Sequence, residues 1–409
     1  MLKSSSPIAY RARYIFSIMQ PPVRDGVLVI DQGQVRFIGQ SAGTIPLIDL
    51  GNAAIVPGLC NAHTHLELSS FDTPLGHPGQ AFPAWIREVV HWRRAQVGTP
   101  EEQLSQRAAA VQRGRQESTA SGVMEIRDIA SPGWQSGWYH APLAATNSHI
   151  FQEVLGLSTA RSEAIFQAVE AVLSQPGSKP NGISPHAPYT VGVELLTKLC
   201  ALSKQQRIPV AMHLAESLDE LELLQSHSGA FYGLLTELDA WDPAAIPRGI
   251  RPQEYLKLLA AADRALVIHG NYLGDEDFAF LAARADHMSL VYCPRTHHYF
   301  GHARYPLPEI LAKGVRVQLG TDSRASNPDL NLWNELRFVA DAYPELSLET
   351  ILHLATSSET GLLAVNDPAN FVVLDVAADN PADPYELLFD PSSRVRAMFR
   401  QGQQVYSVD

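Results

Sequence analysis

The run LCNAHTHL, residues 59–66, carries two histidines two positions apart at the end of a short apolar segment. Side chains at i and i+2 of a β-strand share a face, so His63 and His65 can present their ring nitrogens to one metal ion. Cys60 stands three positions before His63, which predicts a small buried side chain on the opposite face. Because such a pair also occurs by chance, its meaning depends on the rest of the chain.

Seven further β-rich runs follow in residues 57–362, and helical patterns separate them. They are GVMEIRDI (122–129), SHIFQEVLG (148–156), NGISPHA (181–187), PVAMHLAE (209–216), ALVIHGNY (265–272), MSLVYCP (288–294) and VRVQLGTD (315–322). One of the helices between them begins with a capping box, in which Thr99 and Glu102 flank Pro100. Strands that alternate with helices are typical of a parallel sheet, and eight of them predict an α/β fold of the (β/α)8 TIM barrel type.

The two ends of the chain have a different pattern. Residues 1–56 include GVLVIDQGQVRFIGQ and AAIVPG, and residues 363–409 include ANFVVLDV and VRAMFRQGQQVY. These are short β patterns, and neither end is long enough to close a sheet well by itself. We therefore expect a small β-sandwich built from both termini, with the barrel of residues 57–362 between its two parts.

Composition restricts the partners of this chain. With 31 basic and 43 acidic residues the formal net charge is -12, and no basic run exceeds WRRA, so neither nucleic acid nor an anionic membrane is favoured. A small-molecule substrate is the expected partner. Three widely spaced cysteines and the lack of a signal-peptide pattern or a long apolar run predict a cytoplasmic protein.

Further polar residues stand at the carboxyl ends of the predicted strands. They are His186, His213, Glu216, His269 and Asp322. Barrel enzymes keep their catalytic groups at that mouth, whereas structural histidines have no reason to gather there. The pattern therefore favours an active site.

The motifs VPGLCNAHTHLE, ISPHAPYT, MHLAES, VIHGNYL and LGTDS, in this order, resemble the amidohydrolase superfamily. Within it they resemble the branch of cytosine deaminase, the chlorohydrolases and S-adenosylhomocysteine deaminase. The stretches ELELL, YCPRTHHYFGH and GTDSRASNPDLNLWNELR look closest to aminodeoxyfutalosine deaminase-like proteins. One departure is Thr296-His297, where many of these relatives have Ser-Asn.

The resemblance implies one divalent metal ion, Zn or Fe, held by His63, His65, His213 and Asp322. It also implies that Glu216 shuttles a proton, that Asp322 receives a proton from water, and that His269 hydrogen-bonds the hydroxide or the developing tetrahedral centre. Two-metal relatives carry a lysine on the fourth strand, and NGISPHA has none. Because Glu216 follows His213 by three positions, its role requires the chain to leave the strand and curl back.

Substrate contacts are expected from three residues. His186 follows the fourth strand, Arg295 suits a substrate carboxylate, and Trp85 suits stacking on a heterocycle. Each has an alternative, since His186 and Trp85 can serve packing and Arg295 can pair with an acid of the protein. The long connection 217–262 is expected to form part of a lid.

The sequence thus predicts a metal-dependent hydrolase of carbon–nitrogen bonds other than peptide bonds. Its expected reaction is hydrolytic deamination of an aminated N-heterocycle or purine nucleoside such as aminodeoxyfutalosine. Chloride displacement on a triazine-like ring is an alternative, and a non-catalytic scaffold that keeps only the fold is another. The resemblance also suggests a homodimer.

Overall fold

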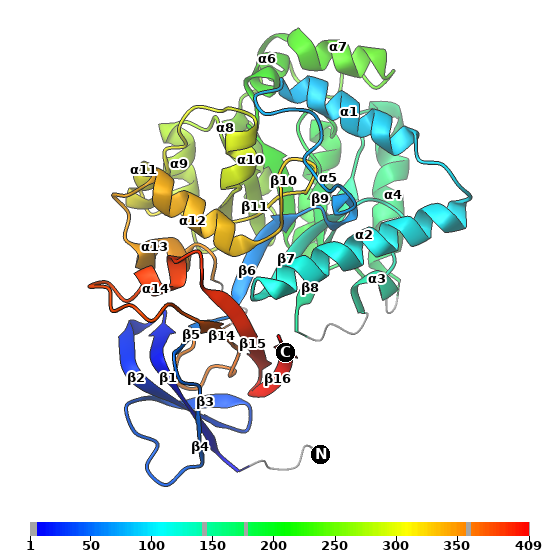
Figure 1. Cartoon of the computed structure of the whole chain (residues 1–409). Helices are drawn as coiled ribbons and strands as arrows, with labels where there is room; N and C mark the ends of the chain where they lie inside the picture. The colour runs from blue at the N-terminus through cyan, green and yellow to red at the C-terminus, as the bar shows by residue number, and fades with distance from the viewer. Residues whose placement is uncertain (1–5, 141–144, 176–178, 357–360, 409) are drawn as a thin grey trace.

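The computed structural model describes residues 6–140, 145–175, 179–356 and 361–408. A barrel wrapped by helices forms the larger body, and a sheet made from both ends of the chain lies below it in Figure 1. The predicted fold class is confirmed.

Eight parallel strands form the barrel in chain order, each hydrogen-bonded to the next. They are β6 (Leu59–Thr64), β7 (Val123–Ala130), β8 (Asn147–Val154), β9 (Gly182–Pro185), β10 (Val210–Leu214), β11 (Ala265–His269), β12 (Met288–Tyr292) and β13 (Val317–Leu319). The last strand meets the first through a parallel bridge between Thr64 and Asp322 and through the Asp322 amide, which donates to the His63 carbonyl at 3.0 Å. Closure of the barrel therefore also brings two predicted ligands side by side.

Helices surround this barrel. They are α1 (Phe82–Arg94), α2 (Pro100–Ala120), α3 (Gly137–His140), α4 (Ser162–Leu173), α5 (Val193–Gln206), α6 (Leu218–Ser226), α7 (Gly229–Glu237), α8 (Pro252–Leu259), α9 (Asp275–Ala282), α10 (Pro294–Tyr299), α11 (Leu307–Ala312), α12 (Leu332–Ala342), α13 (Leu348–His353) and α14 (Glu386–Phe389), with 3-10 turns η1 (Leu66–Leu68) and η2 (Thr159–Arg161). The capping box predicted for α2 is present, because the Thr99 hydroxyl accepts from the Glu102 amide while the Glu102 carboxylate accepts from the Thr99 amide. Within the described ranges, none of these helices has the length and apolar character needed to cross a membrane.

The terminal sheet contains eight strands from both ends of the chain. They are β1 (Ile8–Ser17), β2 (Gln20–Asp31), β3 (Gln34–Gly39), β4 (Leu47–Asp49), β5 (Ala53–Pro57), β14 (Phe371–Asp375), β15 (Arg394–Arg400) and β16 (Gln403–Ser407). β5 and β14 separate β1 from β15, yet the rings of Tyr10 on β1 and Phe399 on β15 lie only 5.2 Å apart. Since neighbouring strands are about 4.8 Å apart, the sheet must curl over its own core. The layers of the predicted sandwich thus come from one continuous sheet.

The sheet and the barrel are joined by a tight connection. Gly58 separates β5 from β6, and a Cβ at this position would lie 2.3 Å from the Met124 sulfur. Alternate residues of β5 point to opposite faces and pack into different bodies. Ile55 packs in the core of the sheet, whereas Ala54 and Val56 pack in the core of the barrel. The two bodies therefore share one buried boundary.

The segment 217–262 contains α6, α7 and α8; α6 and α7 lie at the top of Figure 1, and α7 packs against α1. The α1 and α7 helices are linked by an ion pair between Arg87 and Glu237 at 2.9 Å and by an edge-to-face contact between Phe82 and Phe231. Both helices line the main cavity. The segment thus supplies a wall above the barrel mouth.

Candidate metal centre

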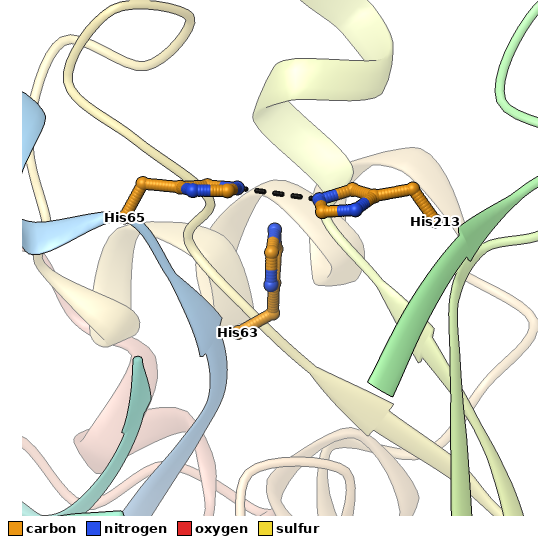
Figure 2. A group of neighbouring side chains, drawn as sticks. All are labelled: His63, His65 and His213. Atoms are coloured by element: carbon orange, nitrogen blue, oxygen red, sulfur yellow. Dashed lines mark hydrogen bonds between the residues drawn. The ribbon is translucent and has the colours of Figure 1, made fainter. Parts of the chain in front are cut away.

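Three histidines from two distant strands direct their rings toward one point (Figure 2). His63 lies in β6, His65 follows the end of that strand, and His213 lies in β10. The Nε2 atoms of His65 and His213 are 3.2 Å apart. Asp322 completes the group, with its Oδ1 atom 3.4 Å from Nε2 of His63 and 3.9 Å from Nε2 of His65.

The hydrogen bond of His213 fixes its tautomer. Its Nδ1 atom lies 2.9 Å from the His186 carbonyl, which can only accept, so Nδ1 carries the proton. Burial, with a smaller contribution from the neighbouring His186, lowers the pKa of His213 to about 4. The ring is therefore neutral at pH 7, and Nε2 offers a lone pair toward His65 and His63. Such a bond from the second ring nitrogen to a carbonyl is typical of metal-ligating histidines.

His63 is the member of this group whose two ring nitrogens are both buried without a hydrogen bond among the described residues. Its side chain is fully buried. Burial lowers the pKa of His63 well below its ordinary value, with added effects from His213 and His186. Three imidazole nitrogens and one carboxylate form a donor set that zinc or iron accepts, so the residues fit the implied metal.

Gly320 holds the backbone close behind His63. A Cβ at Gly320 would lie 2.9 Å from the His63 Cβ and 3.0 Å from its backbone nitrogen and oxygen. Real Cβ atoms essentially never come within 3.0 Å of another such atom, so a side chain at this position would force His63 or the neighbouring strand to shift. The position of His63 therefore depends on Gly320.

Glu216 reaches the centre because the chain turns sharply after β10. Ala215 adopts the left-handed region with φ 53°, and the Glu220 carboxylate accepts from the amides of Ala215 at 2.8 Å and Glu216 at 3.0 Å. The Glu216 carboxylate then lies 3.3 Å from Nε2 of His269. Burial, followed by the charges of Asp322 and Glu220, raises the pKa of Glu216 well above its usual value. The Glu216 carboxyl group therefore holds its proton to a higher pH than an exposed glutamate does, and it lies beside the imidazole of His269.

The end of β11 is strained where His269 enters the site. His269 has φ 66° and Asp322 has φ 56°, conformations that non-glycine residues adopt at a cost of order 1–3 kcal/mol. The Tyr305 hydroxyl donates to the His269 carbonyl at 3.1 Å and helps to hold this conformation. Burial lowers the pKa of His269 well below its ordinary value.

A cavity of about 670 Å³ opens from this group of side chains. His65, His213, Glu216, His269 and Asp322 all contribute to its lining. The opposite walls are mainly apolar and consist of Leu68, Phe82, Trp85, Ile86, Val89, Val90, Leu155, Leu157, Ile165, Phe231, Leu234, Leu235 and Leu238. Ligand sites of about 300–1,000 Å³ with few polar groups hold small organic molecules.

Two of the three predicted substrate residues line this cavity. His186 lies beside its polar end, with Nδ1 2.8 Å from the Thr190 hydroxyl. Trp85 stacks on Phe82 in the wall and donates from Nε1 to the Leu75 and Ala325 carbonyls.

Arg295 does not line this cavity, which corrects the expected substrate contact. Its guanidinium binds the Asp329 carboxylate through two nitrogens, at 2.7 and 3.0 Å, and lies 3.7 Å from Glu335. The guanidinium is therefore engaged in the protein, which is the alternative that the sequence left open. Arg295 itself lies in α10, the helix that follows β12.

Glu153 is a cavity residue that the sequence interpretation missed. It stands near the end of β8, is almost fully buried, and lies 2.9 Å from the Ser131 hydroxyl. The same hydroxyl is 2.5 Å from Glu67, and Glu67 also pairs with Arg93 and Arg107. Burial raises the pKa of Glu153 above its ordinary value.

Comparison with known proteins identifies the family. Residues 54–405 match the model of the amidohydrolase family. The chain belongs to the amidohydrolase family. This family is metal-dependent, in agreement with the fit of the histidine and aspartate donors described above.

This amidohydrolase is similar to several proteins of known activity. It is 30% identical over 322 residues to aminodeoxyfutalosine deaminase of Deinococcus radiodurans, covering 74% of this chain and 72% of the relative. Its fold matches Helicobacter pylori aminofutalosine deaminase in complex with methylthio-coformycin, with a TM-score of 0.82 at 20% identity over 97% of this chain and 100% of the other. It also matches atrazine chlorohydrolase of Arthrobacter aurescens complexed with zinc, with a TM-score of 0.72 at 19% identity over 97% and 94%.

Proposed function

We propose that this amidohydrolase is a hydrolytic deaminase that acts on an aminated N-heterocycle, with purine nucleosides as its preferred substrates. The observation that carries the proposal is the placement of Glu216 and His269 beside the histidine cluster and Asp322, at one end of a large and mostly apolar cavity. Deamination requires an acid for the ring nitrogen, a base for water and an oxyanion partner, and these three residues supply them.

We propose that His63, His65, His213 and Asp322 hold one divalent metal ion, Zn or Fe. Such an ion, when bound, lowers the pKa of water from about 15.7 towards 7 and so makes a nucleophile available at neutral pH. The low pKa values of the buried histidines support this assignment, because their rings need not lose protons to become ligands at pH 7.

The residues of the chain then move the protons. The Asp322 carboxylate accepts a proton from the attacking water, whose oxygen bonds to the ring carbon that carries the amino group. Glu216 donates its proton to the adjacent ring nitrogen, and His269 hydrogen-bonds the oxygen of the tetrahedral centre. Asp322 passes its proton to the amino nitrogen, ammonia leaves, and Glu216 recovers a proton from the hydroxyl group as the carbonyl forms.

The walls of the cavity favour a substrate larger than the heterocycle. Trp85 and the apolar side chains of α1 and α7 suit an apolar or aromatic substituent. Arg161 also lines the cavity, is exposed, and has no ion pair or side-chain hydrogen bond among the described residues. We propose that Arg161, in place of Arg295, binds a substrate carboxylate, while the Glu153 side chain hydrogen-bonds a hydroxyl group of the substrate. Aminodeoxyfutalosine, the substrate named for the Deinococcus relative, is the first compound to test.

The test is ammonia and chloride release by the metal-loaded protein from aminated purine nucleosides, including aminodeoxyfutalosine, and from amino- and chloro-triazines. We expect ammonia from at least one nucleoside, released about a hundredfold or more slowly by the Glu216→Gln variant. Chloride release without ammonia would replace the proposal with chlorohydrolysis. No product from any compound at full metal occupancy would contradict both reactions and leave a non-catalytic scaffold.

We further propose that the protein is a cytoplasmic homodimer and that segment 217–262 acts as a lid. The cysteine content and the resemblance support the first two proposals, and the position of α7 in the cavity wall supports the third.

A further inference from the structure

A second polar cavity, of about 270 Å³, lies at the opposite mouth of the barrel, where the strands begin. It shares no lining residue with the cavity of the metal centre. Its basic lining residues are Arg127, His149, Arg207, Arg264, His287 and Arg316, and Asp286 is its one acidic lining residue among those described. We call it the basic cavity.

The topology of the barrel explains why these arginines meet. Arg207 precedes β10 by three positions, and Arg264 and Arg316 stand directly before β11 and β13. Because the amino ends of parallel strands lie at one mouth, side chains that precede neighbouring strands gather there. Arg127 of β7 reaches the same place from inside the barrel, is 8% exposed, and donates from Nη1 to the Gln318 side chain at 2.8 Å.

The charge of the basic cavity is not balanced by its own lining. Asp286 lies 2.8 Å from Nδ1 of His287, and the guanidinium of Arg264 is 3.8 Å from Asp263, which stands outside the lining. In the described parts of the chain, the guanidinium groups of Arg207 and Arg316 have neither an ion pair nor a side-chain hydrogen bond. Four arginines therefore face one hollow in a chain whose net charge is -12.

We propose that the basic cavity binds a small phosphorylated anion, such as a phosphate monoester. Guanidinium groups form bidentate bonds to phosphate oxygens, and several of them around one hollow suit a dianion better than a single carboxylate. The volume of about 270 Å³ lies just below the range of about 300–1,000 Å³ for sites of drug-sized molecules, which limits the ligand to a small metabolite. Barrel enzymes perform their chemistry at the other mouth, so this site binds and does not catalyse.

The test measures the thermal midpoint of the metal-loaded protein during titration with inorganic phosphate, with ribose 5-phosphate, and with sodium chloride at matched ionic strength. The variant is Arg207→Gln combined with Arg316→Gln, two exposed positions outside the proposed catalytic machinery. Arg248→Gln is the matched control, because Arg248 is exposed and lies outside the basic cavity.

We expect both phosphate compounds to raise the midpoint of the parent protein, and chloride to leave it unchanged. The double variant should bind them about tenfold more weakly or worse, and Arg248→Gln should match the parent. Tighter binding of ribose 5-phosphate than of inorganic phosphate identifies a monoester, and equal binding identifies the free ion; either result supports the site. Equal stabilisation of parent and double variant, or an equal effect of chloride, overturns the proposal.

Discussion

Glu220→Gln tests how the protein places its proton donor. Glu220 is fully buried in the first turn of α6, and its two carboxylate oxygens accept from the amides of Ala215 and Glu216 at 2.8 and 3.0 Å. Glutamine retains one acceptor and turns an NH2 group toward the second amide, so one buried N–H loses its partner. Such a loss costs about 1–3 kcal/mol. If this cost falls on the turn that presents Glu216, kcat falls by between about 5-fold and about 160-fold.

The assay is steady-state ammonia release, together with metal content and the thermal midpoint of each variant. Glu222→Gln is the control, because Glu222 lies on the same helix and is exposed. We expect kcat to fall for Glu220→Gln with little change in KM and full metal content, and no change for the control. Burial raises the pKa of Glu220 to about 7, so the parent carboxylate becomes protonated as the pH falls through this value. The difference between parent and variant should therefore shrink in acid. An unchanged kcat for Glu220→Gln would refute the argument.

Three further predictions concern the metal centre and the cavity. Glu216→Gln should keep its metal and lose about a hundredfold or more of its turnover. Burial raises the pKa of Glu216, so kcat/KM of the parent should fall as the pH rises and Glu216 loses its proton. The pH profile of the variant should lack this fall. Gly320→Ala should weaken zinc affinity about 10- to 100-fold in a chelator competition, because the new Cβ displaces His63. Gly137→Ala is the control and should leave zinc affinity unchanged, because a Cβ at Gly137 would have no atom within 4 Å. Arg161→Met should raise KM about tenfold for a carboxylate-bearing nucleoside and not for an uncharged one, and equal changes for both would place Arg161 outside the binding site.

The sequence predicted the barrel and the position of its polar residues for a simple physical reason. Parallel strands end at one mouth, so residues such as His63, His213 and Asp322, each at or just past the end of a strand, must gather there. Glu153 satisfied the same criterion near the end of β8 and could have been found in this way.

Other features depend on contacts that the sequence pattern does not contain. Arg295 is bound by Asp329 and Glu335. These two acids lie in the region after β13, at 34 and 40 positions further along the chain than Arg295. The role of Glu220 depends on the left-handed conformation of Ala215, a residue with no evident turn preference. The curvature that turns the terminal strands into one continuous sheet follows from packing of aromatic rings between β1 and β15, which no local pattern of alternation specifies.

The central claim is that His63, His65, His213 and Asp322 together hold one divalent ion. Elemental analysis of protein prepared without chelators, in parallel with a His63→Ala variant, tests it most directly. We predict about one Zn or Fe atom per chain in the parent and a large loss in the variant. A parent free of transition metal, or a His63→Ala variant with the metal content of the parent, would contradict the account.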